Sequence, residues 1–538
     1  MLPPRPPVAK AEGRALRFNN PECQDGSTSP GAAATSHEGN PQKMPKSGDD
    51  RRISKKEYEA RLPKVRAALV RMQVALKTAK FPVILQIAGV EASGKGEVIN
   101  ILNGWLDPRG FETFAFHDPT DEERERPAMW RYWRTIPPDG RMAIYAGGWH
   151  ADALRQDPRS ARELALFDGT LRRIAAFEGQ LAAGGALIVK IWLHLSKSQQ
   201  RARLRELESD PRTAWRVTPD DWKSQRDYER LARLAERMRV ATHQPAAPWN
   251  IVDSSDPRAR NLAIAEILLT RFRAHLRALA RAAAAGPGRR RKVVPLRPAG
   301  LRRLLSLSLE SKLSQAAYEK KRDKWLGRLN KVVRAAGQER RSVVWVFEGW
   351  DAAGKGGAIR RLTDAIDARD FRVIPVSKPN DEEKAHHYLW RFWRHVPRAG
   401  MVTIYDRSWY GRVLVERLEG FATEPEWRRA YRELNEFERE LTEHGVIVLK
   451  FWLHIGKEEQ LRRFRDREGT PYKSHKMDAE DWRNRRKWAA YEIAVGDMLA
   501  LTSTRTAPWH LVAANNKRHA RLQILKTSCQ QIEAALGL

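Results

Sequence analysis

A glycine-rich segment at residues 348–357, "EGWDAAGKGG", has the composition of a phosphate-binding loop. Gly349 opens the motif, and Gly354 and Lys355 close it at the spacing that such loops require. Backbone amides at the start of the following helix can surround a phosphate, and the lysine ammonium can neutralise it. Gly356 stands where the usual motif has a magnesium-binding Ser or Thr. The metal ligands must therefore come from elsewhere.

Two aspartates can replace the missing hydroxyl. Asp351 lies inside the loop, and Asp406 follows the apolar run "MVTIY" in the segment "YDRSWYGR". An aspartate at the end of a buried strand is a usual metal ligand in P-loop folds that transfer phosphoryl groups. We therefore expect Asp351 and Asp406 to bind one Mg²⁺ ion. Arg407 and Arg412 flank the same strand end and are expected to contact a phosphate chain.

A strongly basic segment at 462–488 follows farther along the chain. Its helix–loop–helix pattern beside a P-loop predicts a lid that closes over phosphates and excludes water. Arg467 and Lys473 lie nearest the Gly-Thr-Pro break. Trp390 and Trp393 stand three residues apart on an expected helix, a spacing typical of core packing rather than of base stacking. The expected phosphate-binding residues are Gly349, Gly354, Gly356, Gly357, Lys378, Arg412, Arg467 and Lys473.

Apolar, β-rich runs alternate with helical patterns in the second half of the chain. This alternation predicts a parallel sheet covered by helices. The expected strands are 342–347, 371–376, 401–405, 445–455 and 507–514, and two of the expected helices are 357–367 and 426–444.

The sequence contains two copies of the same unit. Lys95 and Lys355 stand at an offset of 260 residues (355 − 95), and Trp130 and Trp390 keep this offset, as do several further aromatic pairs. A period this long indicates tandem domains rather than a solenoid.

The first copy has lost the predicted metal chemistry. Glu91 stands at the position of Asp351, Ala146 at that of Asp406 and Gly147 at that of Arg407, while Lys95 is kept. We expect a disordered tail over 1–50, a degenerate and inactive domain over 51–280, a linker over 281–300 and a catalytic domain over 301–538.

Composition limits the class of partner. Lys and Arg number 98 against 66 Asp and Glu, a formal charge of +32 that attracts polyanions such as nucleic acid, anionic membranes or polyphosphate. No apolar stretch approaches the length that a transmembrane helix needs. Two cysteines and the lack of a signal-peptide pattern indicate a cytoplasmic protein.

The motifs "GWDAAGKGG", "SKPNDEE", "WRFWRHVP", "YDRSWYGR" and "YKSHKMDAEDW" together resemble the polyphosphate kinase 2 family. The tandem arrangement is similar to that of its fused members, which are polyphosphate:AMP phosphotransferases. The resemblance implies two P-loop kinase-like three-layer α/β/α units, each with a parallel sheet and a helical lid. It implies transfer of a phosphoryl group from inorganic polyphosphate to AMP with Mg²⁺. By this resemblance Asp351, Lys355, Asp406 and Arg407 would be catalytic. Because single-unit relatives tend to oligomerise, the resemblance also implies a homo-oligomer as a candidate state.

Three alternatives remain open. The acceptor could be ADP or GDP, the donor could be ATP, or the chain could be a nucleic-acid-binding P-loop protein. The charge and the tryptophan content motivate the last alternative, but no nucleic-acid-binding module is recognisable. We therefore expect neither nucleic acid nor a membrane as a partner.

Overall fold

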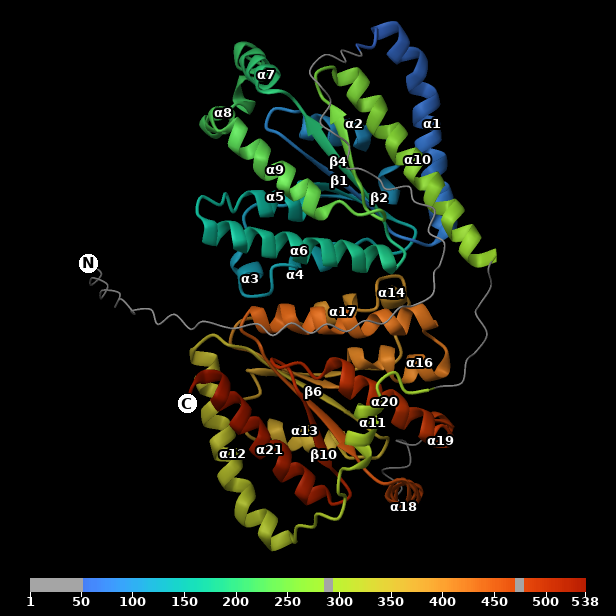
Figure 1. Ribbon diagram of the computed structural model, residues 1–538, viewed down its shortest axis with the longest axis vertical. Helices are drawn as coiled ribbons and strands as arrows, with labels where there is room; N and C mark the ends of the chain where they lie inside the picture. Colours follow the sequence, from blue (N-terminus) through green and yellow to red (C-terminus); the bar gives the residue numbers. More distant parts are fainter. Residues whose placement is uncertain (1–51, 285–293, 470–478) are drawn as a thin grey trace, which may run out of the picture. The chain divides into compact units, whose positions relative to one another are not determined.

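The computed structural model describes residues 52–284, 294–469 and 479–538. The predicted tail over 1–50 and the predicted lid residue Lys473 lie outside these ranges. Each repeat is built on a five-stranded parallel sheet with helices on both faces (Figure 1). None of the helices in the described ranges has both the length and the apolar content that crossing a bilayer would need.

The first repeat alternates strands with helices. Its strands are β1 (Val83–Gly89), β2 (Phe111–Ala115), β3 (Met142–Ala146), β4 (Leu187–His194) and β5 (Trp249–Asp253). Its helices are α1 (Lys55–Ala79), α2 (Lys95–Trp105), α3 (Asp121–Arg124), α4 (Trp130–Trp133), α5 (Gly148–Leu154), α6 (Ala161–Ala183), α7 (Lys197–Ser209), α8 (Pro219–Arg226), α9 (Tyr228–Thr242) and α10 (Pro257–Ala284). Two 3₁₀ turns span Pro108–Gly110 and Ala214–Arg216.

The second repeat follows the same plan and adds one short helix at its start. Its strands are β6 (Val343–Gly349), β7 (Phe371–Pro375), β8 (Val402–Asp406), β9 (Ile447–His454) and β10 (Trp509–Ala513). Its helices are α11 (Pro298–Leu305), α12 (Gln315–Gln338), α13 (Lys355–Thr363), α14 (Asp381–Lys384), α15 (Trp390–Trp393), α16 (Val415–Glu419), α17 (Glu424–Glu443), α18 (Lys457–Glu468), α19 (Ala479–Arg486), α20 (Trp488–Thr502) and α21 (Lys517–Leu536). A 3₁₀ turn spans Trp409–Val413.

The strand order is β2-β3-β1-β4-β5 in the first sheet and β7-β8-β6-β9-β10 in the second. Alternate residues of β1 face opposite layers, as the pleat of a strand requires. Val83, Leu85 and Ile87 pack with residues of α1, α2 and α10, whereas Ile84 and Ala88 pack with residues of α6 and α9. The predicted three-layer α/β/α architecture is therefore confirmed.

Element boundaries differ most from prediction in two places. Helix α13 ends at Thr363 rather than at residue 367. The amides of Ala365 and Ile366 donate to carbonyls three residues back, which is the 3₁₀ rather than the α-helical pattern. Helices also occupy both ends of the predicted linker, since α10 runs to Ala284 and α11 begins at Pro298.

The two repeats share a buried aromatic contact. The rings of Trp133 on α4 and Trp393 on α15 stack with centroids 5.7 Å apart and planes 14° apart. The repeats are also joined by Glu125 of the first repeat, which accepts hydrogen bonds from Arg398 at 2.5 Å and from Arg340 at 2.7 Å. The prediction that Trp390 and Trp393 belong to the core is confirmed, because both are buried.

A buried ion pair joins a strand to a helix in each repeat. Lys450 on β9 donates from Nζ to Glu438 Oε2 at 2.7 Å and to the Thr502 carbonyl at 2.7 Å, and both side chains are buried. The first repeat has the same arrangement, with Lys190 2.6 Å from Glu178. Burial lowers the pKa of the Lys450 ammonium, and Glu438 acts against that shift. The pair ties α17 to the central strands.

Removing one partner of this pair should destabilise the second repeat strongly. Glu438→Ala leaves a buried ammonium without its carboxylate, a change that costs about 3–5 kcal/mol. We expect a clear fall in the thermal unfolding midpoint. Glu424→Ala on the same helix breaks only the exposed pair with Arg428 and should change the midpoint little. Equal midpoints for the two variants would contradict this account of the core.

Candidate active site

The glycine-rich loop joins β6 to α13. Gly349 has φ +152°, and a Cβ there would lie 2.5 Å from the Leu453 carbonyl oxygen, so only glycine lets β6 end against β9. Gly354 has φ +109° and nothing within 4 Å of its Cβ position, so the space above the helix start is open. Lys355 donates from Nζ to the carbonyls of Gly349 at 2.9 Å and Trp350 at 3.3 Å. The loop has the geometry of a phosphate cradle.

A cavity of about 930 Å³ opens above this loop. Among the described residues that line it, seven are Lys or Arg and four are Asp, so the lining carries a net positive charge that suits a polyanion. It brings together eight of the twelve predicted site residues, namely Asp351, Gly354, Lys355, Gly356, Gly357, Asp406, Arg407 and Arg467.

The two aspartates reach the cavity from neighbouring strands. β6 and β8 pair in parallel with Phe347 opposite Asp406, so the loop that leaves β6 and the end of β8 lie side by side. Asp351 Oδ1 accepts from Arg407 Nη2 at 3.2 Å, and its Oδ2 accepts from Asn484 Nδ2 at 3.1 Å. Asp406 Oδ2 lies 4.0 Å from the Cβ position of Gly356, which places it over the start of α13.

These residues fit a magnesium site in its usual form. Mg²⁺ is commonly held by one or two carboxylates together with substrate phosphates and water. Asp351 and Asp406 supply two carboxylates at one cavity, and no group of three or more His, Cys, Asp or Glu within the described ranges forms a complete protein cage. The two carboxylates therefore suit a metal ion whose remaining ligands are phosphate oxygens and water.

Arg407 holds an unusual backbone conformation. Its φ is +64°, a left-handed value that costs a non-glycine residue roughly 1–2 kcal/mol. Its amide donates to the Phe347 carbonyl at 3.0 Å, which fixes the turn after β8. Burial alone lowers the Arg407 pKa. The nearby carboxyl groups of Asp351, Glu348 and Asp406 raise it by more, so the net shift is upward. The guanidinium is therefore charged and surrounded by carboxylates.

Basic residues that were not predicted complete the wall of the cavity. Lys517 and Arg521 come from the start of α21, and Arg360 comes from α13. Burial and the neighbouring guanidinium groups of Arg463 and Arg462 lower the Lys517 pKa. The "NNKRHARLQ" segment that carries Lys517 and Arg521 gave only the signal of a basic terminal helix, and its distance in sequence hid its position.

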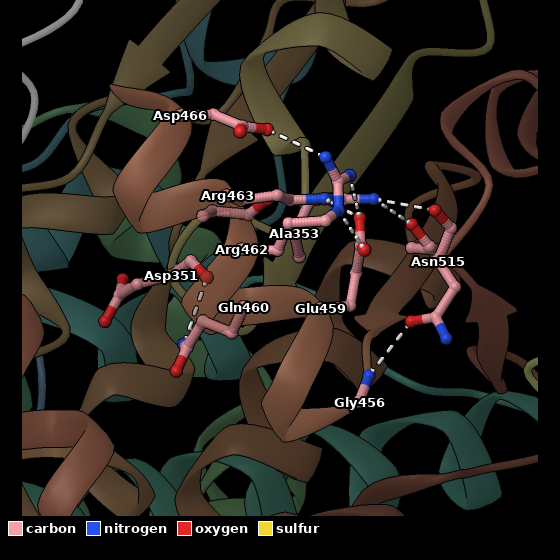
Figure 2. A network of polar contacts seen from close by, with 11 residues as sticks. Asp351, Ala353, Gly456, Glu459, Gln460, Arg462, Arg463, Asp466 and Asn515 are labelled. Carbon is pink, nitrogen blue, oxygen red and sulfur yellow. Dashed lines mark hydrogen bonds and ion pairs between the residues drawn. The ribbon is translucent and has the colours of Figure 1, made fainter. Parts of the chain in front are cut away.

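Arg463 supports the loop from behind. It donates from Nη1 to the carbonyls of Ala352 and Ala353 at 2.9 and 3.0 Å, and from Nη2 to those of Ala514 and Asn515 at 2.7 and 2.9 Å (Figure 2). Gln460, one helical turn earlier on α18, donates to the Asp351 carbonyl at 3.1 Å. Helix α18 therefore fixes the P-loop backbone as well as bordering the cavity.

Four predicted phosphate contacts are placed elsewhere or not described. Gly349 packs against β9 and does not line the cavity. Lys378 lines a smaller adjoining pocket that shares Ser377 with the main cavity. Arg412 pairs with Glu416 at 2.8 Å and Glu426 at 3.1 Å, so its guanidinium is neutralised away from the loop, and the predicted phosphate contact has no support here. Lys473 lies outside the described residues.

The corresponding loop of the first repeat has different partners. Lys95 forms an ion pair with Glu91 at 2.9 Å and also donates to the Gly89 and Val90 carbonyls. Ala146 and Gly147 replace the carboxylate and guanidinium after the strand. This repeat keeps the fold of the loop without the predicted metal ligands.

Comparison with known proteins gives a consistent result. The family model described as "Polyphosphate kinase 2 (PPK2)" matches residues 52–278 and again 312–536. A protein named polyphosphate:AMP phosphotransferase from Pseudomonas aeruginosa is 47% identical over 90% of this chain and 97% of its own length. One of the same name from Pseudomonas syringae pv. tomato is 43% identical over 89% of this chain and 96% of its own.

A solved structure shows the same architecture. The crystal structure of a putative polyphosphate kinase 2 from Pseudomonas aeruginosa aligns with a TM-score of 0.80 at 44% identity. The alignment covers 90% of this chain and 97% of that chain. The match extends over both repeats.

Glu348, the last residue before Gly349, is a buried carboxyl group that sequence reasoning missed. Ser408 donates to its Oε1 at 2.8 Å. Burial raises the Glu348 pKa to about 7, although Ser408, Lys355 and Arg407 favour the charged form. Its position inside the loop motif, together with a serine in "YDRSW", was the available signal.

Glu348→Gln should change how stability depends on pH. A raised pKa means that the folded wild type binds this proton more tightly than the unfolded chain, so its stability falls as pH rises from about 4.5 through about 7. The neutral glutamine removes this dependence. Without added metal, we expect the unfolding midpoint of Glu348→Gln to rise relative to wild type between pH 5 and pH 8. Parallel pH profiles for the two proteins would contradict the raised pKa.

Proposed function

The chain belongs to the polyphosphate kinase 2 family, and on that premise we propose that its second repeat transfers the terminal phosphoryl group of inorganic polyphosphate to AMP and yields ADP. One observation carries the proposal. A single cavity gathers a phosphate-binding loop, two aspartates and a wall of cations in a chain that is 47% identical, over 90% of its length, to a protein named polyphosphate:AMP phosphotransferase.

The cations explain the donor. Polyphosphate carries about one negative charge per phosphate, so a surface that binds it needs a density of Lys and Arg like that needed for a nucleic-acid backbone. Lys517 and Arg521 from α21 line the same cavity as Arg407. Several phosphates in a row can therefore be neutralised together, which a site for a single phosphate would not require.

The transfer itself asks mainly for positioning. An oxygen of the AMP phosphate attacks the terminal phosphorus in line, the P–O–P bond to the next phosphate breaks, and the shortened polyphosphate leaves with the electron pair and negative charge. The loop amides and Lys355 hold the transferred group, and Arg407 offers a second cation beside it. No covalent intermediate on the protein is needed.

We propose that Asp351 and Asp406 hold a Mg²⁺ ion bound with the phosphates. When bound, the ion neutralises the charge on the phosphate oxygens. The Arg407–Asp351 pair then has a further role, because it orients one of the two carboxylates before the ion and the substrate arrive.

We also propose that residues 51–280 are a non-catalytic partner of the catalytic domain 301–538, and that the reaction takes place in the cytoplasm. The stacked pair Trp133 and Trp393 supports the first part, because it makes the first repeat part of the hydrophobic core next to the second. The free buried thiol of Cys529 fits a reducing compartment.

The substrate assignment can be tested with a nucleotide panel. AMP and polyphosphate, with Mg²⁺ and without ATP, should yield ADP, and chelation of the metal should stop the reaction. Product is measured by chromatography. Faster turnover of ADP or GDP would favour those acceptors, and product only with ATP as the donor would favour a nucleotide kinase. ATP hydrolysis that requires nucleic acid would favour a nucleic-acid-binding P-loop protein.

The division between the repeats can be tested at matched positions. Asp406→Ala gives the second repeat the residue that the first has at Ala146, and it should lower kcat by at least about 100-fold, since it removes charge stabilisation at the transferred group. Lys355→Ala should also inactivate, whereas its counterpart Lys95→Ala should leave kcat unchanged. Comparable losses for Lys95→Ala and Lys355→Ala would contradict an inactive first repeat.

A further inference from the structure

The first repeat has its own cavity, of about 570 Å³, beside its modified loop. We propose that this cavity is a binding site for a purine nucleoside, with the base enclosed by Val90, Trp192, Tyr228 and Leu231. A volume of this size lies within the usual range for small-molecule sites. The inference concerns a second ligand and is independent of the transfer reaction at the other repeat.

The cavity coincides with the loss of an aromatic stack. In the second repeat the Trp350 ring lies on the Trp488 ring with centroids 3.7 Å apart and planes 5° apart, and Tyr491 lies 5.7 Å from Trp350. The corresponding residues of the first repeat are Val90, Tyr228 and Leu231. A valine in place of an indole leaves space for a flat ring next to aromatic and aliphatic side chains, which is the packing a nucleobase favours.

Two buried polar atoms at this cavity lack a partner within the described part of the chain. They are Trp192 Nε1, a donor, and Gln200 Oε1, an acceptor, on side chains that are 3% and 2% exposed. Both residues line the cavity. An unpaired buried polar group is costly, so such atoms mark a place where a ligand completes the hydrogen bonding.

The second repeat satisfies the corresponding atoms internally. Trp452 Nε1 donates to His454 Nδ1 at 3.3 Å, and Gln460 Oε1 accepts from Arg485 Nη1 at 3.3 Å. Gln225 stands at the position of Arg485 in the first repeat, so the guanidinium donor is replaced by a shorter amide, and Gln200 Oε1 has no partner among the described residues. One donor and one acceptor are what the edge of adenine complements, since N7 accepts and the N6 amino group donates.

The phosphate side of this site is closed, which favours a nucleoside over a nucleotide or polyphosphate. Arg260, 3% exposed, donates to the Ser93 carbonyl at 3.1 Å and to Glu97 at 3.2 Å. Its guanidinium lies where a Cβ on Gly94 would collide, whereas the space above Gly354 is open. Glu97 stands at the position of Gly357. Its negative carboxylate lies at the start of the helix, where a phosphate would otherwise bind, and repels one.

The site can be tested by titrating the full chain with adenosine in a calorimeter. Wild type should bind adenosine, and Val90→Trp, which restores the residue of the second repeat, should lose one bound adenosine per chain. The matched control Val74→Trp adds the same side chain at an exposed position of α1 and should bind like wild type. Phosphoryl transfer to AMP should be unchanged in both variants.

Two further results decide the case. Gln200→Met keeps the side-chain length but removes the acceptor, and it should weaken adenosine binding about tenfold, the factor that corresponds to one net hydrogen bond of about 1.4 kcal/mol; it also serves if Val90→Trp fails to fold. Adenosine binding that is unaffected by Val90→Trp and Gln200→Met places the nucleoside at the second repeat and overturns the proposal. Absence of binding at millimolar adenosine overturns it as well.

Discussion

The parallel pairing of β6 with β8 is the constraint on which the active cavity depends. Both strands end at the same edge of the sheet, so the loop after β6 and Asp406 at the end of β8 meet without any long-range adjustment. Open α/β sheets bind ligands at the carboxyl ends of their strands for this reason. The buried Lys450–Glu438 pair holds α17 against the adjoining strand β9, and Arg463 clamps the loop from the other side. The packing of the core thus determines where the loop and Asp406 lie.

Charges of both signs meet at this edge. Asp351 is already paired with Arg407, and cations such as Lys517 and Arg521 line the same cavity. Burial lowers the Lys517 pKa most, and repulsion from the guanidinium groups of Arg463, Arg462 and Arg521 lowers it further. A polyanion relieves that repulsion over several positions at once, which is a physical reason for the high positive charge of the chain.

The sequence predicted much of this because the informative residues are local. The loop motif and the aspartate after an apolar strand are short-range patterns, and the constant offset between the repeats is seen by aligning the two halves of the chain. Together they led to the correct architecture and to eight of the residues that line the cavity. Lys517 and Arg521 were missed because they reach the site through the fold from the end of the chain. Arg412 was assigned to phosphate because it flanks the same strand end as Arg407, but the 3₁₀ turn over Trp409–Val413 places it beside Glu416 and Glu426. Glu348 was overlooked because burial, which raises its pKa, cannot be read from residue type.

The stacked tryptophans of α4 and α15 have a consequence for how the protein responds to dilution. Two separate subunits that meet through such a contact dissociate as their concentration falls, because association costs translational and rotational freedom. Joining the repeats in one chain makes their association intramolecular. The linker then sets the effective concentration of one repeat near the other, and the concentration of the protein in the cell does not. The fused chain therefore keeps its two repeats associated at low protein concentrations, at which an equivalent pair of separate subunits would dissociate.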